Sequence, residues 1–284
     1  MMQPEYILTL TCPDRKGVVH TISGILLRHH GNIIDSSQFG DEGTGLFFLR
    51  IHFSLEQANE LTRLQDSLKD LEASMGVRWS TTECKKKMRV LIAVSRLGHC
   101  LNDLLFRWEN SLLPIKVCAV FSNHEQLKPM TVQRSVPFFH HPVSQDNRDA
   151  QEKALLKLIE EMDIELVVLA RYMQILSPSI CEALSGRIIN IHHSFLPSFK
   201  GAQPYKQAYE RGVKLIGATA HYVTNQLDEG PIIEQDVERV SHTLSSTELS
   251  QIGADIESRV LARAVKWHAE HRILLNGSKT VVFS

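Results

Sequence analysis

Four short apolar runs constrain the fold of this chain most strongly. Each has the length of a strand and is almost uninterrupted by polar residues; they are Val90–Val94, Ile115–Phe121, Leu166–Ala170 and Ile188–Ile191. Runs of this kind are typical of strands that are buried on both faces. Between the second and the third run, residues 149–162 carry apolar side chains at the spacing of an amphipathic helix. Strands that alternate with helices predict an α/β fold with a doubly wound, mainly parallel sheet, whose ligands bind beyond the carboxyl ends of the strands.

A different pattern occupies the first 84 residues. The predicted order is strand, helix, two strands, helix and strand, at residues 6–11, 18–27, 33–39, 46–53, 56–72 and 77–82. Asp14 is a candidate cap for the first helix, and the stretch Gly40–Gly45 predicts a hairpin loop. This βαββαβ order, with the turn Pro13–Gly17 before the first helix, resembles an ACT domain, a ferredoxin-like regulatory module of many amino-acid and one-carbon enzymes.

The polar and basic stretch Glu83–Lys87 separates this pattern from the first apolar run. We interpret it as a solvated linker. The sequence therefore predicts two domains, which are an ACT regulatory domain at residues 1–84 and a catalytic domain at residues 85–284. A last helix at about residues 247–270 is expected to pack on the sheet of the second domain.

The charge balance argues against nucleic acid and anionic membranes as partners. The 31 Lys and Arg residues nearly cancel the 32 Asp and Glu residues, for a net charge of −1, whereas proteins that bind nucleic acid carry a basic surface. The five cysteines are odd in number and lack paired spacing, which indicates reduced thiols in cytosol. The N-terminus lacks the features of a signal peptide, and no apolar stretch approaches the roughly 20 residues of a membrane span. We therefore expect a soluble, cytoplasmic protein with a small-molecule ligand.

Two polar residues lie at the end of the fourth apolar run. Asn190 and His192 are two residues apart, so their side chains point to the same side of a strand. An Asn amide can donate to an oxygen that becomes negative during attack on a carbonyl, and a neutral imidazole can move a proton near pH 7. Asp228, in a Leu-Asp-Glu-Gly-Pro turn, could orient His192 or hold a water in line with a carbonyl carbon. Taken singly, Asn190 could also cap a turn, His192 could lie in the interior, and Asp228 could simply start the turn.

These residues are part of a longer signature. Asn190-Ile191-His192, Leu196 to Gly201, His221-Tyr222-Val223 and Asp228 to Ile233 resemble the signature of formyltetrahydrofolate-dependent formyltransferases, and the resemblance covers about residues 88–284. It implies a Rossmann-like sheet, formyltetrahydrofolate as the substrate with no further cofactor, and Asn190, His192 and Asp228 as catalytic residues. It also implies a pterin pocket lined, largely through backbone groups, by Arg171–Leu176 and Thr224–Asp228. The substrate-binding candidates are Met173, Gln174, Leu176, His221, Thr224 and Leu227.

The loop after the first apolar run indicates which acceptor is used. In glycinamide ribonucleotide transformylases this loop is rich in glycine and serine and binds the phosphate of the acceptor through backbone N–H groups. Here Ser95–Leu105 has a single glycine and bulky side chains. Together with the N-terminal ACT module, this loop is similar to that of formyltetrahydrofolate deformylases, in which water replaces the amine. The resemblance implies a hydrolase that converts 10-formyltetrahydrofolate to tetrahydrofolate and formate, supplying formate for purine biosynthesis and balancing the one-carbon folate pool.

The resemblance also implies a role for each catalytic residue. Asp228 positions the water and helps to deprotonate it, Asn190 donates to the developing oxyanion, and His192 donates to that oxyanion and assists proton transfer to the departing folate nitrogen. The alternatives are a formyltransferase with an amine acceptor, and a regulatory protein whose site has lost its chemistry. The crowded loop disfavours the first alternative, and the intact set of three residues disfavours the second.

Two residues of the loop Ser95–Leu105, here called the acceptor-side loop, have open roles. His99 could close the acceptor side and bond the water, and Cys100, at the start of a helix, could be mildly acidified or could only pack. No metal site is predicted, because the adjacent pairs His29-His30, His140-His141 and His192-His193 lack the i, i+4 spacing of a helical zinc site. ACT modules commonly pair with one another, so we expect a homo-oligomer, with an amino-acid effector near the turn Pro13–Gly17.

Overall fold

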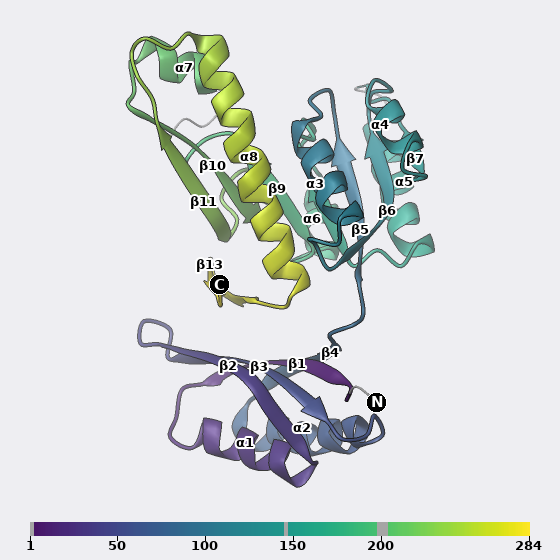
Figure 1. Ribbon diagram of the computed structural model, residues 1–284, viewed down its shortest axis with the longest axis vertical. Coiled ribbons are helices and arrows are strands. Elements are labelled where there is room, and N and C mark those ends of the chain that lie inside the picture. Colours follow the sequence, from purple (N-terminus) through teal and green to yellow (C-terminus); the bar gives the residue numbers. More distant parts are fainter. Residues whose placement is uncertain (1–2, 145–146, 198–203) are drawn as a thin grey trace. The chain divides into compact units, whose positions relative to one another are not determined.

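The computed structural model describes residues 3–144, 147–197 and 204–284. The chain forms two compact units, which are Met1–Lys87 with Glu270–Ser284, and Met88–Ala269 (Figure 1). Within the described ranges, none of the helices combines the length and the apolar character of a membrane span. Residues 198–201 of the formyltransferase-like signature lie outside the described residues.

The first unit is an antiparallel sheet with two helices on one face (Figure 1). Its first six elements are β1 (Glu5–Pro13), α1 (Val18–Arg28), β2 (Gly31–Asp41), β3 (Leu46–Leu55), α2 (Glu60–Met75) and β4 (Arg78–Glu83). The strand order is β2-β3-β1-β4, and alternate residues of the central strands, such as Leu8, Leu10, Leu49 and Ile51, are buried together in one core. The predicted βαββαβ order is confirmed.

The start of α1 differs from the prediction. The helix begins at Val18 and is preceded by Gly17, which has φ 91° and provides no side-chain cap. Asp14 lies three residues too early to cap this helix, and its N–H instead donates to the carbonyl of Gly45. A glycine suits the position because it adopts a left-handed conformation without a Cβ clash.

The second unit contains the predicted doubly wound sheet. Its elements are β5 (Met88–Val94), α3 (His99–Glu109), β6 (Ile115–Ser122), α4 (Lys128–Val132), β7 (Phe138–His140), α5 (Arg148–Glu161), β8 (Leu166–Leu169), α6 (Pro178–Ala183), β9 (Ile188–His192), α7 (Pro204–Glu210), β10 (Leu215–Tyr222), β11 (Ile232–Arg239) and α8 (Ser246–Ala269). The strand order is β11-β10-β9-β8-β5-β6-β7. The pairs from β9 across to β7 are parallel, so the four apolar runs form the buried centre, as predicted.

The two remaining strands of this sheet run antiparallel to their neighbours. β10 pairs with β9, and the register places His221 opposite Asn190 and Thr219 opposite His192. β11 then pairs with β10, so the segment between them, which contains Asp228, lies at the end of the sheet where β9 terminates. The fold therefore brings a residue some 36 positions away in the sequence to the carboxyl end of β9.

The C-terminal residues belong to the first unit. β12 (Ile273–Asn276) and β13 (Lys279–Val282) form a hairpin. The guanidinium of Arg50 donates to the carbonyl oxygens of Glu270 and His271, and Asn276 donates to Asp41 over 2.6 Å. The observed division therefore differs from the predicted catalytic domain, 85–284, at both of its ends. The contacts that attach residues 270–284 to the first unit span more than 200 positions, and no local pattern reports them.

Candidate active site

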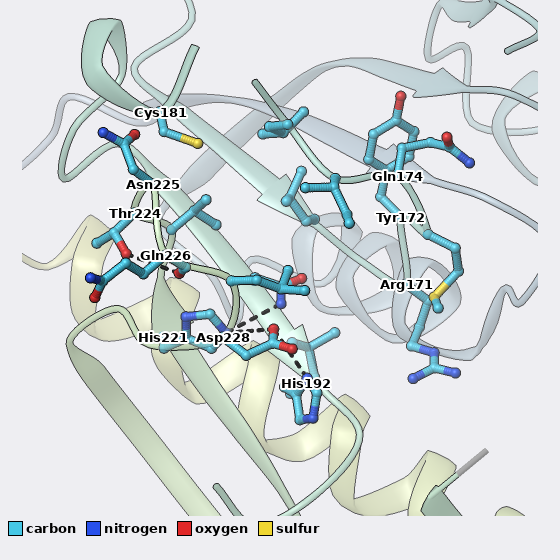
Figure 2. Close-up of a pocket in the computed structure, with 18 of the residues that line it drawn as sticks. Arg171, Tyr172, Gln174, Cys181, His192, His221, Thr224, Asn225, Gln226 and Asp228 are labelled. Atoms are coloured by element: carbon cyan, nitrogen blue, oxygen red, sulfur yellow. Dashed lines mark hydrogen bonds and ion pairs between the residues drawn. The ribbon is translucent and has the colours of Figure 1, made fainter. Parts of the chain in front are cut away.

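Asn190 and His192 share one side of β9, and both line the same pocket as Asp228. The backbone of Asp228 is in the left-handed region, with φ 56°, a conformation that short polar residues tolerate better than most. This turn brings Oδ1 of Asp228 to 3.2 Å from Nδ1 of His192 and 3.7 Å from Nε2 of His221 (Figure 2). The structure therefore brings together the three predicted catalytic residues.

His221 fixes the orientation of Asn190. Nδ1 of His221 lies 2.9 Å from the carbonyl oxygen of Tyr222, and Nε2 lies 3.2 Å from Nδ2 of Asn190. Because a carbonyl only accepts, Nδ1 carries the hydrogen, and Nε2 of the neutral ring accepts from the amide of Asn190. The second N–H of that amide remains to act on a ligand. His221, predicted as a substrate contact, is therefore also a positioning residue.

Asp228 is ionised in this environment. Burial by itself would raise the pKa of the carboxyl group, but the interaction with His192, whose Nδ1 donates to the carboxylate, outweighs that effect, and the pKa is lowered. The imidazole of the adjacent His193 stacks on His192 with ring centres 5.0 Å apart. Burial, reinforced by Arg171 and His192, lowers the pKa of His193 to about 4, so His193 is neutral at pH 7.

A pocket of about 430 Å³ opens beside these residues (Figure 2). One wall is formed by the segment that follows β8 and the other by the segment between β10 and β11. The pocket is lined by all six predicted substrate-binding residues, namely Met173, Gln174, Leu176, His221, Thr224 and Leu227. Met173 and Leu227 are more than half exposed, so they offer apolar surface to a flat ring. The volume and lining suit a ligand of drug-like size with an aromatic part.

The wall after β8 is held by Ser95. Its hydroxyl accepts from the backbone N–H of Met173 over 3.0 Å and donates to Asn123 over 2.7 Å, and its own N–H donates to the carbonyl of Arg171. Ser95 is nearly fully buried. The first residue of the acceptor-side loop therefore supports the pocket rather than contacting a phosphate.

His99 and Cys100 lie at the start of α3, and neither lines the pocket. Nε2 of His99 is 2.7 Å from Oε2 of Glu257, a residue of α8 that is only 1% exposed. Cys100 is fully buried, and burial together with Glu257 raises the pKa of its thiol strongly. Of the two interpretations of Cys100, packing is the one that this environment supports, because a protonated, inaccessible thiol is inert.

Sequence reasoning missed Glu257 and Tyr205. The hydroxyl of Tyr205 donates to Oε1 of Glu257 over 2.7 Å, and the side chain of Arg171 approaches Oε2 at 3.5 Å. A signal was present, because Glu257 adjoins the apolar positions Ile256 and Val260 on an amphipathic helix, and a carboxylate at such a position needs partners.

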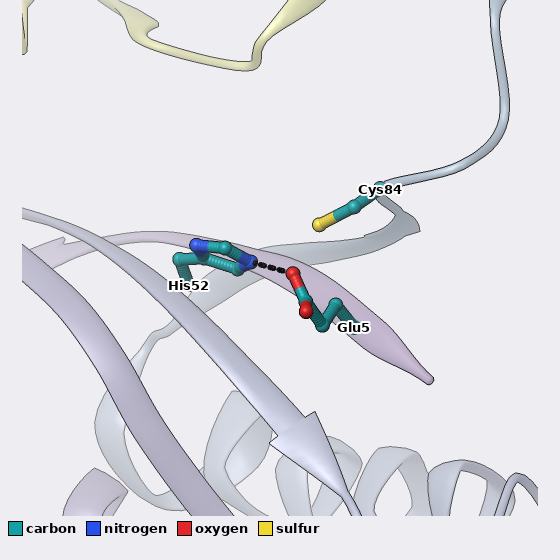
Figure 3. A group of neighbouring side chains, drawn as sticks. All are labelled: Glu5, His52 and Cys84. Carbon is teal, nitrogen blue, oxygen red and sulfur yellow. Dashed lines mark hydrogen bonds and ion pairs between the residues drawn. The ribbon is translucent and has the colours of Figure 1, made fainter. Parts of the chain in front are cut away.

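Two groups of residues within the described ranges have metal-ligand chemistry. His99, Cys100 and Glu257 bring one donor atom each within 4.8 Å of the others, but Glu257 is already bound by His99 and Tyr205 and lies beside a cationic guanidinium. The second group, Glu5, His52 and Cys84, lies on the sheet of the first unit (Figure 3). A 2.8 Å hydrogen bond joins Glu5 to His52 and accounts for their proximity. We assign no metal to either group.

Comparison with known proteins agrees with the two units. Residues 88–265 match the family described as formyl transferase, and residues 6–72 match the ACT domain. The chain is 47% identical to the formyltetrahydrofolate deformylase of Corynebacterium sp. (strain P-1), with 99% of this chain and 98% of the relative covered. It is 48% identical to the formyltetrahydrofolate deformylase of Bacillus subtilis (strain 168), with 98% and 93% covered. The crystal structure of the formyltetrahydrofolate deformylase from Burkholderia mallei superimposes with a TM-score of 0.94 at 44% identity, covering 99% of this chain and 100% of that one.

Proposed function

This chain belongs to the formyltetrahydrofolate deformylase family, and from that premise we propose how Asn190, His192 and Asp228 carry out its reaction. The protein is a hydrolase that converts 10-formyltetrahydrofolate and water to tetrahydrofolate and formate. The bond between the formyl carbon and a folate nitrogen breaks, and a bond between that carbon and the oxygen of water forms. One proton of the water passes to the nitrogen, and the other leaves when formic acid ionises.

His192 and Asp228 act as a pair. The 3.2 Å contact between Nδ1 of His192 and the carboxylate is the observation that carries the proposal. A neutral His192 donates its Nδ1–H to Asp228 and presents the lone pair of Nε2 to the pocket. Nε2 has no partner among the described residues, so it is available to take a proton from the attacking water. Asp228 stabilises the imidazolium, which then passes the proton to the departing nitrogen.

The lowered pKa of Asp228 supports this division of roles. A carboxylate that holds its charge so firmly is a weak proton acceptor at neutral pH. We therefore propose that Asp228 positions the water and the imidazole. His192 carries out the proton transfer. Asn190, held by His221, directs an amide N–H at the oxygen that becomes negative.

The test is a formate-release assay. Purified protein and 10-formyltetrahydrofolate are incubated without an acceptor, and formate and tetrahydrofolate are both quantified. Equal amounts of the two products are expected. A second incubation contains an added primary amine; formylation of that amine, with no formate in the first incubation, would instead establish the amine-acceptor alternative.

We propose that the reaction takes place in the cytoplasm, because all five cysteines are free thiols. The ACT domain supports control by a small-molecule effector, for which we propose an amino acid near Pro13–Gly17, and we propose that the protein is a homo-oligomer. We further propose that formyltetrahydrofolate is needed only as the substrate, without a separate cofactor, and that the formate serves purine biosynthesis and the one-carbon balance. Formate release measured with and without glycine or methionine tests the effector.

A further inference from the structure

Unsatisfied polar atoms gather at one end of the pocket. Among the described residues, five buried side-chain atoms lack a hydrogen-bond partner, and three of them belong to two pocket residues: Nε and Nη1 of Arg171 and Nε2 of His192. Buried N–H groups without acceptors are costly, especially on a charged side chain. Such atoms are expected where a ligand supplies the missing acceptor.

Arg171 is built into this position rather than left on a surface. Its side chain is only 10% exposed. Its backbone has φ 64°, a left-handed conformation that favours glycine and costs most other residues on the order of 1 kcal/mol. A long cationic side chain therefore stands at a position where the backbone conformation favours glycine.

Glu257 compensates the charge of Arg171 without occupying its donors. Oε2 of Glu257 lies 3.5 Å from Nε of Arg171, an ion pair that does not meet hydrogen-bond geometry. The strong bonds of this carboxylate go to His99 and to Tyr205, each over 2.7 Å. The buried cation is therefore balanced in charge, while its N–H groups remain available to a small oxygen ligand.

Arg171 and His192 lie toward the same end of the pocket. In Figure 2 the guanidinium and the imidazole both extend toward the end of the pocket that is away from Gln174 and Asn225. Arg171 and His192 also both act electrostatically on His193, which stacks on His192. In the proposed reaction, the formyl carbon must lie beside Nε2 of His192, so the species present at this end after hydrolysis is the released one-carbon acid.

We infer that Arg171 forms a subsite for formate, in which its guanidinium N–H groups, and the imidazole of His192 once it has taken the proton of the ionising formic acid, donate to the carboxylate oxygens of the product. Glu257, His99 and Tyr205 are positioning residues for the guanidinium. The inference rests on the proposed function, because formate reaches this position as the product of hydrolysis. Since Glu257 already balances the cation, formate binds weakly and leaves readily.

The experiment measures formate binding directly, with the full-length protein and without folate. Titration with ¹³C-labelled formate is followed by NMR line broadening for the wild type, Arg171→Met, Arg171→Lys and the control Arg263→Met. Met matches the length of the arginine stem but has no N–H, Lys keeps the charge, and Arg263 is a half-exposed arginine of α8 that pairs with Glu234 and Asp236. Wild type and Arg263→Met should bind formate with equal affinity, Arg171→Met at least tenfold more weakly, and Arg171→Lys at an intermediate level.

A kinetic measurement keeps the inference testable if affinity is too low for NMR. Added formate should inhibit the wild-type reaction, and Arg171→Met should raise the inhibition constant at least tenfold, whereas Arg263→Met should leave it unchanged. Formate inhibition that is unchanged in Arg171→Met, or an equal loss in Arg263→Met, would overturn the subsite. So would a wild type that shows neither saturable binding nor inhibition.

The outcomes separate the two proposals. A protein that binds formate through Arg171 but releases none from formyltetrahydrofolate would contradict the hydrolytic function alone. A protein that hydrolyses the substrate but shows no formate binding that depends on Arg171 would contradict the subsite alone.

Discussion

Asn190 and His221 face each other across the antiparallel pair β9 and β10, and the amide nitrogen of Asn190 lies 3.2 Å from Nε2 of His221. The other ring nitrogen is committed to a backbone carbonyl, so the ring can only accept from the amide. The amide donor of the site is therefore oriented by a residue on the neighbouring strand, and this arrangement can be tested by mutation.

Replacing His221 with Phe should lower kcat about 10- to 100-fold, because a misdirected catalytic group costs about that much. An aromatic ring is kept, but the acceptor for Asn190 is lost. If His221 acts through Asn190, the double variant with Asn190→Ala should be no slower than Asn190→Ala alone. Steady-state kinetics of the two single variants and the double variant decide this; fully multiplicative losses would show that the two residues act independently.

Asp228→Asn should reduce kcat by ~10²- to 10⁴-fold, because the neutral amide neither holds the water nor stabilises a protonated His192. Binding of the folate should change little, since Asn has nearly the same size as Asp and the rest of the pocket lining is unchanged. Equilibrium folate binding and formate release are measured side by side. Asp66→Asn, which alters an exposed ion pair on α2, is the matched control. Parallel loss of binding and turnover would argue against the role assigned to Asp228.

Gly230→Ala should displace the turn that carries Asp228. A Cβ at this position would overlap the carbonyl oxygen of Tyr222, a backbone atom that also ends β10. We expect a loss of stability of about 1–3 kcal/mol and a reduced kcat. Gly24→Ala in α1 is the control, because a Cβ there meets no atom within 4 Å and alanine favours a helix by ~1 kcal/mol. Denaturant unfolding and kinetics of both variants provide the comparison; a fully active, stable Gly230→Ala protein would refute this view of the turn.

The buried His193 should make the protein sensitive to mild acid. Its pKa is lowered to about 4, against an ordinary value of about 6.5 in an unfolded chain. Between these two values the unfolded chain binds a proton that the folded protein does not, so the free energy of unfolding falls as the pH decreases. The loss between pH 6.5 and pH 4 should reach about 3 kcal/mol, from roughly 1.4 kcal/mol per pKa unit.

Unfolding curves over this pH range, for the wild type and His193→Asn, measure the contribution. The variant has no group to titrate at this position, so its stability should fall less steeply with acid. His20→Asn, at an exposed position of α1, should retain the slope of the wild type. Identical slopes for the wild type and His193→Asn would show that His193 is not responsible.

Local patterns predicted much of the architecture, because a strand that is buried on both faces consists almost entirely of apolar residues. The runs Val90–Val94 and Ile188–Ile191 became β5 and β9 with nearly the predicted bounds, and residues 149–162 became α5 within one residue. Helix starts were predicted less well: α1 follows Gly17 rather than an Asp14 cap, and α2 begins at Glu60 rather than near residue 56. Several side chains can satisfy a helix start, and only the surrounding turn selects one.

The sequence by itself determined that two domains of different pattern are joined in one chain, and that an amide, an imidazole and a carboxylate are available at the end of a buried strand. These features are local, since they depend on period, on turn residues and on motifs a few positions long. Only the tertiary structure decided that His221 orients Asn190, that Glu257 of α8 lies beside Arg171, and that residues 270–284 join the first unit. These contacts join positions 31 to 235 residues apart. At such separations the arrangement depends on how strands and helices pack together, and no short-range pattern records the outcome.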